Sequence, residues 1–192
     1  ADGQMRAVIL NSGGANACTG PDGFADTHRT AEHVAQALTE AGHEVGPGDV
    51  GVCSTGLIGE RLPMDRLLSG ADAAVTVLSE AGGPDAATAI MTTDTVAKTS
   101  TVSVDGFTVG GMAKGAGMLA PALATMLVVV TTDAVVDAAQ TDASLRAACA
   151  LTFVSVPSEP SRSSAFELMS SSSVRLPPPV RASWAMSWPA RW

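Results

Sequence analysis

Aromatic residues are scarce in this sequence: Phe, Trp and Tyr together make up 4%, and Tyr is absent. Hydrophobic residues nevertheless reach 46%, so a core must be built from Ala, Val, Leu, Ile and Met. A chain of 192 residues is long enough for one domain with such a core. No apolar run approaches the roughly 20 residues of a membrane span, and no basic-then-apolar leader is present. We therefore expect a soluble protein without a membrane partner.

Basic residues and cysteines are also few. The net charge is −8, and residues 1–153 hold 17 acidic against 7 basic residues, which argues against a nucleic-acid partner. Cys18, Cys53 and Cys149 are widely spaced with no C-x-x-C, so neither a disulfide framework nor a zinc site is indicated, and a reduced cytoplasm fits best. The five-residue spacing of His28 and His33 does not align two imidazoles on one helix face, so we expect no metal site.

Periodicity predicts a mixed α/β (α+β) body. Short apolar runs predict buried strands at Val8–Leu10 and Val128–Val130, and a further short strand at Val50–Ser54. Asp105-Gly106 predicts a hairpin with a two-residue I′ turn between Thr101–Val104 and Phe107–Gly110. Helices are predicted from about Met64, over Ala86–Ile90, after Asp133, and on an apolar face ended by Gly42 that comprises Phe24, Thr27, Ala31, Val34, Leu38 and Ala41.

The character of the chain changes at Val154. Residues 154–192 contain 11 Ser, 6 Pro and all three Trp, but no Gly, Lys, Asn or Asp. No period of 2 or 3.6 persists there. We therefore divide the chain into a body, 1–153, and a tail, 154–192, that we expect to be disordered.

The segment Lys114 to Ala134 contains the strongest candidate for chemistry. A glycine-rich turn and a Pro-bounded apolar stretch deliver Ala124-Thr125 to the start of the Val128–Val130 strand. A Thr placed in this way is expected where a backbone bond is cut to expose an N-terminal nucleophile, because its own α-amino group can then take the hydroxyl proton. On pattern alone, the simpler interpretation is a Thr that opens a buried strand.

Three further positions could form a site with Thr125. Thr55-Gly56 follows a predicted strand and can aim a hydroxyl and an unpaired backbone N–H at one point, as an oxyanion hole requires, although Thr-Gly is also a common turn. Thr92, in Met91-Thr-Thr-Asp94, could bind an amino-acid group or cap a turn. Lys114 is the single charge between Phe107 and Thr132, where a lone cation is costly unless paired.

Five ordered stretches resemble the ornithine acetyltransferase family (glutamate N-acetyltransferase, a bifunctional arginine-biosynthesis enzyme). One is the Ala-Thr-Met-Leu at Ala124, which in that family contains the self-cleavage bond. The other four are AVILNSGGANACTG from Ala7, CSTGLIGERLPMDRL from Cys53, AIMTTDTVAK from Ala89 and VGGMAKGAGML from Val109. The resemblance covers roughly residues 5 to 153.

The resemblance implies the layered sheet-and-helix fold of the self-cleaving N-terminal-threonine acetyltransferases, incomplete here. Residues 1–124 would belong to the first chain of the cleaved enzyme and residues 125–153 would begin the second. Cleavage would fall between Ala124 and Thr125, leaving Thr125 as the nucleophile and a substrate contact. By the same resemblance, Thr55 and Gly56 form the oxyanion hole.

The resemblance further implies that Thr92 and Lys114 bind substrate. The reaction would transfer acetyl from N-acetylornithine to glutamate through an acetyl-threonine, with no cofactor; some members also use acetyl-CoA as donor. The two cleaved chains assemble into a heterotetramer in the family. Two alternatives stay open: an inactive fragment of that enzyme, and a self-processing N-terminal-Thr aminopeptidase or amidase.

The family pattern also predicts where this sequence departs from the enzyme. A sizeable segment normally precedes the Ala7 motif, so we expect that the N-terminus is missing. The abrupt change after Phe153 is what a shifted reading frame in a GC-rich gene would produce, with a genuine Ser/Pro-rich linker as the alternative. With so little of the second chain present, we expect little or no cleavage before Thr125.

Overall fold

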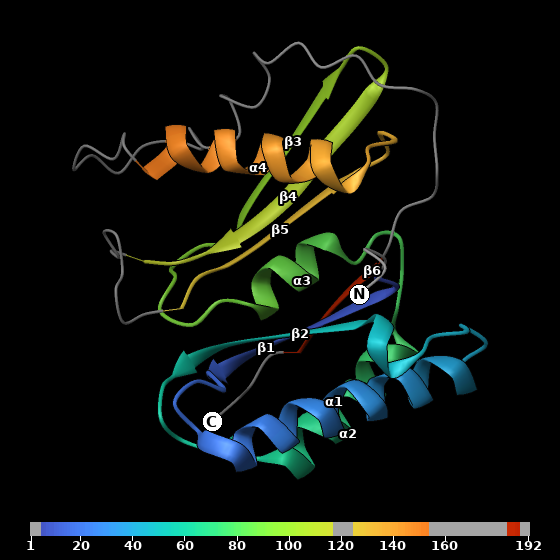
Figure 1. Ribbon diagram of the computed structural model, residues 1–192, viewed down its shortest axis with the longest axis vertical. Helices are drawn as coiled ribbons and strands as arrows, with labels where there is room; N and C mark the ends of the chain where they lie inside the picture. Colours follow the sequence, from blue (N-terminus) through green and yellow to red (C-terminus); the bar gives the residue numbers. More distant parts are fainter. Residues whose placement is uncertain (1–4, 117–124, 154–183, 189–192) are drawn as a thin grey trace.

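The computed structural model describes residues 5–116, 125–153 and 184–188. It contains two three-stranded sheets, of order β2-β1-β6 and β3-β4-β5, layered with helices (Figure 1). None of the helices in these ranges is both long and apolar enough to cross a lipid bilayer. The elements are β1 Ala7–Gly14, α1 Gly20–Glu40, the 3-10 turn η1 Pro47–Asp49, β2 Val50–Leu57, α2 Met64–Thr76, α3 Gly83–Ala89, β3 Lys98–Val104, β4 Phe107–Lys114, β5 Leu127–Thr132, α4 Ala138–Phe153 and β6 Trp184–Trp188.

The first sheet is parallel, because α1 carries the chain back from the end of β1 to the start of β2. Helices α1 and α2 cover one face of it, and Ile9, Val34 and Ala71 are among the buried residues of this layer. The helix predicted to end at Gly42 is confirmed as α1, but its predicted apolar face is only partly right. Phe24 is 68% exposed, whereas the α1 residues Asp26 and Thr30 are buried.

The second sheet is antiparallel, and its hairpin turn has the predicted form. Asp105 and Gly106 both adopt positive φ, at 50° and 85°, as a two-residue I′ turn requires. Helix α3 lies between the two sheets (Figure 1). Leu10, Ile90 and Met112 belong to one apolar cluster, which joins β1, the end of α3 and β4. The predicted mixed α/β class is therefore confirmed, and one core fixes how the two sheets meet.

Strand β5 exists as predicted, but the predicted burial of Val128–Val130 is wrong. Leu127 is buried and Val129 packs against the same cluster, while Val128 and Val130 are 49% and 36% exposed. Alternate residues of a strand face opposite sides of a sheet. The apolar run of β5 therefore has one buried face and one face that no described residue covers fully.

Strand β6 also differs from the sequence prediction. Its residues lie in the tail that we expected to be disordered, yet Trp184–Trp188 pairs in parallel with β1. The sequence Trp-Ala-Met-Ser-Trp alternates large and small residues at period two, which suits a strand. The alternation spans only five residues, and the rest of the tail has no periodicity, so the sequence pattern did not predict this strand. The rest of the tail lies outside the described residues, and the boundary at residue 153 stays a prediction.

Candidate active site

Thr55 and Gly56 lie at the end of β2, where β1 fixes their positions. Ser12 pairs with Thr55 and Gly13 with Gly56 in the parallel register. Gly56 has φ 132°, and a Cβ on it would lie 2.3 Å from the Gly13 carbonyl carbon, so only glycine fits. The Thr55 side chain is fully buried. The two residues therefore present a hydroxyl and a backbone N–H on a rigid strand end.

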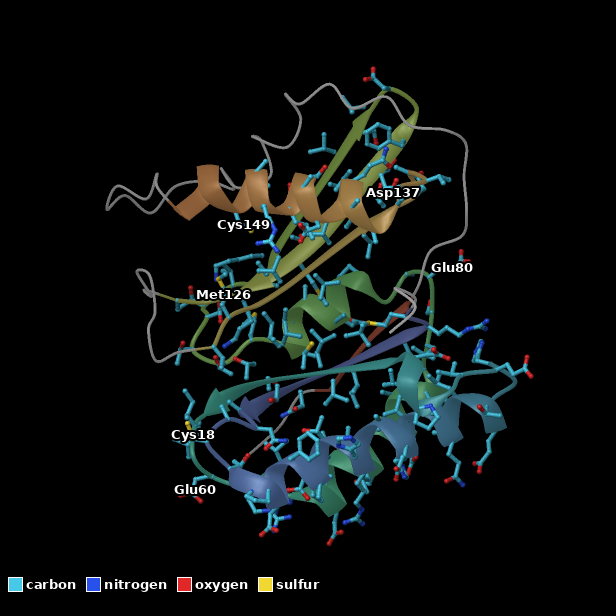
Figure 2. The ribbon with its side chains drawn as sticks, viewed as in Figure 1. Cys18, Glu60, Glu80, Met126, Asp137 and Cys149 are labelled. Carbon is cyan, nitrogen blue, oxygen red and sulfur yellow. The ribbon has the colours of Figure 1, made fainter. Side chains whose placement is uncertain are left out.

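Thr125 lies just before β5 and meets this strand end. Its Oγ1 is 2.7 Å from Thr55 Oγ1 and accepts a hydrogen bond from the Gly56 N–H at 3.3 Å. The β4–β5 ladder brings it there, because Lys114 pairs with Leu127, two residues beyond Thr125. Strands β1, β2 and β4 end on the same side of the molecule (Figure 1), the side on which Met126 is labelled in Figure 2.

Lys114, the last residue of β4, is 3% exposed and contacts two hydroxyl groups. Its Nζ donates to Thr55 Oγ1 at 2.9 Å and to Thr92 Oγ1 at 2.7 Å. Burial lowers the pKa of Lys114, the charge of Asp94 raises it, the charge of Lys98 lowers it, and the pKa is lowered overall. A buried ammonium is thus held beside the Thr55 hydroxyl.

Thr92 and Asp94 lie in the turn that follows α3. Thr92 reaches the site through Lys114, while Asp94 accepts hydrogen bonds from Lys98 and from the Gly115 N–H, the latter at 2.8 Å. Burial raises the pKa of Asp94, but the hydrogen bonds from Lys98 and Gly115 outweigh burial and lower its pKa overall. Asp94 Oδ1 is therefore engaged within the protein, whereas its buried Oδ2 has no hydrogen-bond partner among the described residues.

The structure thus brings together Thr55, Gly56, Thr92, Lys114 and Thr125. Ala124, on the other side of the predicted cleavage bond, lies outside the described residues. Sequence reasoning missed Lys98. Its i,i+4 spacing from Asp94 indicates a pair only on a helix, whereas these residues lie in a turn and at the start of β3. Among the described residues, no three His, Cys, Asp or Glu side chains are grouped to hold a metal ion.

This arrangement suits a nucleophilic hydroxyl. Thr125 Oγ1 accepts from the Gly56 N–H and shares a hydrogen bond with the Thr55 hydroxyl, to which Lys114 Nζ donates. Donors placed so close to a nucleophile are suited to stabilise the negative charge that develops when it attacks a carbonyl group. The geometry therefore favours acyl chemistry at Thr125.

Among known proteins, the model of the ArgJ family matches residues 1–179. The chain belongs to the ArgJ family. The ArgJ match extends past Phe153, so it ends later than the five motifs that we used to set the boundary of the resemblance.

Two curated ArgJ relatives illustrate how much is shared. The arginine biosynthesis bifunctional protein ArgJ of Streptomyces coelicolor is 63% identical over 157 residues, covering 82% of this chain and 40% of the relative. Its counterpart in Mycobacterium tuberculosis strain H37Rv is 56% identical over 181 residues, covering 92% of this chain and 45% of the relative. This chain therefore spans less than half the length of these curated relatives.

A solved ArgJ-type structure supports the fold. The crystal structure of ornithine acetyltransferase complexed with ornithine, from Mycobacterium tuberculosis, is 60% identical with a TM-score of 0.55. The similarity covers 62% of each chain. The layered α/β architecture described above is thus shared with a solved member of this group.

Proposed function

We propose that this chain carries the nucleophile half of an ornithine acetyltransferase, which moves acetyl from N-acetylornithine to glutamate. The observation that supports this best is the convergence on Thr125 Oγ1 of the Thr55 hydroxyl and the Gly56 N–H, from a strand about 70 residues away in sequence. Local structure cannot produce such a convergence. Family membership and the ornithine-bound relative agree with an amino-acid substrate.

The first half-reaction forms an acetyl-threonine. The Thr125 hydroxyl attacks the acetyl carbonyl of N-acetylornithine, and the α-amino group of Thr125, free after cleavage, takes the hydroxyl proton. The amide C–N bond then breaks, and the departing ornithine amine receives that proton. The Gly56 N–H and the Thr55 hydroxyl stabilise the oxyanion, at about 2.7–4 kcal/mol for each donor in comparable sites.

The second half-reaction returns the enzyme to its starting state. The amine of glutamate attacks the acetyl-threonine ester, the C–O bond to Thr125 breaks, and Oγ1 regains a proton from the attacking amine. Thr92 and Lys114 hold the substrate in position, which can supply a large part of the rate. No cofactor takes part in this scheme, and acetyl-CoA is an alternative acetyl donor.

Self-cleavage before Thr125 belongs to the same proposal, because it releases the α-amino group that the first half-reaction uses. The two resulting chains stay together and pair into a heterotetramer in the cytoplasm. Ala124 supplies the carbonyl that Thr125 attacks. These steps extend the family resemblance to a protein of its relatives' full length.

A second candidate is a hydrolase with the same nucleophile, an N-terminal-Thr aminopeptidase or amidase in which water replaces glutamate. The same hydrogen bonds at Thr125 would serve it. The relative bound to ornithine favours the transferase. A third candidate is an inactive fragment, in which the geometry is inherited and unused.

Coexpression of residues 1–124 with residues 125–192 tests the proposal without requiring cleavage, since the second piece then begins at Thr125. We expect N-acetylglutamate from N-acetylornithine and glutamate, and its loss in Thr125→Ala. Thr131→Ala, on the exposed part of β5, is the matched control and should keep the activity. Acetate in place of N-acetylglutamate would support the hydrolase, and no product at all would support the inactive fragment.

A further inference from the structure

Both lysines of this chain, Lys98 and Lys114, are associated with one buried carboxylate, Asp94. Its Oδ1 accepts a hydrogen bond from Lys98 Nζ and a second from the Gly115 N–H at 2.8 Å. Gly115 directly follows Lys114. The carboxylate is therefore bonded to the side chain of one lysine and to the backbone beside the other.

We propose that the Asp94–Lys98 pair positions Lys114. The pair holds the end of β4 in place, and its two charges set the electrostatic potential at the Lys114 ammonium. This inference rests on the proposed function only in taking Lys114 as part of the site. The proposal assigns neither Asp94 nor Lys98 a contact with substrate.

Two adjacent hydrogen bonds support the first part of the proposal, that the end of β4 is held in place. The Thr92 hydroxyl accepts from Lys114 Nζ at 2.7 Å, and two residues later Asp94 accepts from the Gly115 N–H. The turn after α3 is thereby bonded to the side chain of Lys114, the last residue of β4, and to the backbone N–H of Gly115, the residue after it. Because the Asp94 side chain is fully buried, water does not compete for the Gly115 N–H.

The opposite charges of Asp94 and Lys98 support the second part of the proposal, the electrostatic effect on Lys114. In the described part of the chain, the charged groups that act on Lys114 are Asp94, which raises its pKa, and Lys98, which lowers it. Lys98 comes from β3 and Asp94 from the turn before it. Removing one or the other should therefore move the Lys114 pKa in opposite directions, which a loss of packing alone would not do.

Titration of the full 192-residue chain by NMR, with lysine labelled with ¹³C at Cε, tests the inference directly. Only two side-chain signals are expected, and Lys98→Ala assigns them by removing one. We expect Asp94→Asn to lower the Lys114 pKa and Lys98→Ala to raise it. Asp133→Asn is the matched control: Asp133 accepts from the Thr108 N–H at 2.6 Å near the other end of β4, and its loss should move neither signal.

The sign of the change decides the outcome. If Asp94 only supported the local packing, Asp94→Asn would admit water and move the Lys114 pKa up toward its ordinary 10.5, which would overturn the proposal. An unchanged pKa in Lys98→Ala would overturn it equally. The Lys98 side chain is 45% exposed, so that variant keeps the test available if Asp94→Asn does not fold.

Amide exchange gives a second readout, for the positioning part. Asp94→Ala removes the acceptor of the Gly115 N–H, and we expect that amide to exchange faster than in the unaltered chain, while the Thr108 amide does not change. Equal exchange at Gly115 would contradict the positioning role. Neither readout requires acetyl transfer, so a failure here and a failure of the proposed function are separate results.

Discussion

Gly56 occupies a backbone conformation that other residues rarely adopt, and it does so against the backbone of β1. We expect Gly56→Ala to lower the free energy of unfolding by about 1–3 kcal/mol from backbone strain alone. The contact of 2.3 Å with the Gly13 carbonyl carbon adds to that loss. Urea denaturation measures the loss. Acetyl transfer by the coexpressed pieces 1–124 and 125–192 should fall as well, because the Gly56 N–H moves.

Gly59 provides the control for that substitution. It also has positive φ, at 90°, but no atom lies within 4 Å of the position that a Cβ on it would take. Gly59→Ala therefore measures the loss of stability from the positive φ alone, without a close contact at Cβ. A loss in Gly59→Ala as large as in Gly56→Ala would show that the approach of β1 to Gly56 adds nothing.

Asp94 should make the stability of the chain depend on pH in the acid range. Its pKa is lower in the folded state than the ordinary 3.8, so its contribution is fully present above 3.8 and is lost as the pH falls through the lowered value. We expect Asp94→Asn to be less stable at neutral pH and to show a flatter dependence in this acid range. Urea unfolding at a series of pH values measures both, and parallel curves for the two proteins would contradict the prediction.

At the scale of elements, β5 shows how far a sequence pattern can be interpreted. Its β-branched run predicted a strand correctly, yet burial depends on what lies over each face, and that is a property of the tertiary structure. The hairpin was more predictable, because positive φ at Asp105 and Gly106 follows from the residues themselves. Strand β6 was missed because pairing with β1 joins residues about 177 apart, which no local pattern records.

The two faces of β5 should respond differently to truncation. Leu127→Ala removes a buried side chain from the cluster between the sheets, and we expect a loss of about 2–5 kcal/mol. Val128→Ala, its neighbour on the 49% exposed side, should change stability by no more than about 0.5 kcal/mol. Thermal or urea unfolding of both variants tests this. Equal losses would show that a further partner covers the outer face.

At the scale of the whole molecule, the candidate site depends on both sheets. Thr55 and Gly56 belong to the first sheet, Lys114 ends β4 of the second sheet, and Thr125 lies just before β5. Helix α3 carries the chain to Thr92 between them. The motifs identified each of these residues in sequence. Their convergence could not be read from the sequence, because it depends on the apolar cluster that joins the sheets.

Cleavage before Thr125 would divide the 192 residues into pieces of 124 and 68, since 192 − 124 = 68. Attack by Thr125 on the Ala124 carbonyl needs a preorganised, strained loop as well as the oxyanion donors. This chain spans less than half the length of its curated relatives. We expect intact mass spectrometry of the purified chain to show one uncleaved species.

Two stoichiometric products, the second beginning at Thr125, would contradict that expectation and show that this part of the protein assembles the cleavage site unaided. Sequencing the coding DNA in all three frames tests the frameshift hypothesis separately. The family continuation should appear in another frame after about Val154, and its absence from the other frames would leave the Ser/Pro-rich linker as the explanation.

The different exposure of the two lysines also affects how this protein can be labelled. Besides the α-amino terminus, Lys98 is the accessible amine for an ester-based dye or a crosslinker, because Lys114 is 3% exposed. A tag at Lys98 would convert its ammonium to an amide and remove a charge beside Asp94. Such a conjugate would carry its reporter on the partner of Asp94, and the reporter would alter the contacts that it was meant to observe.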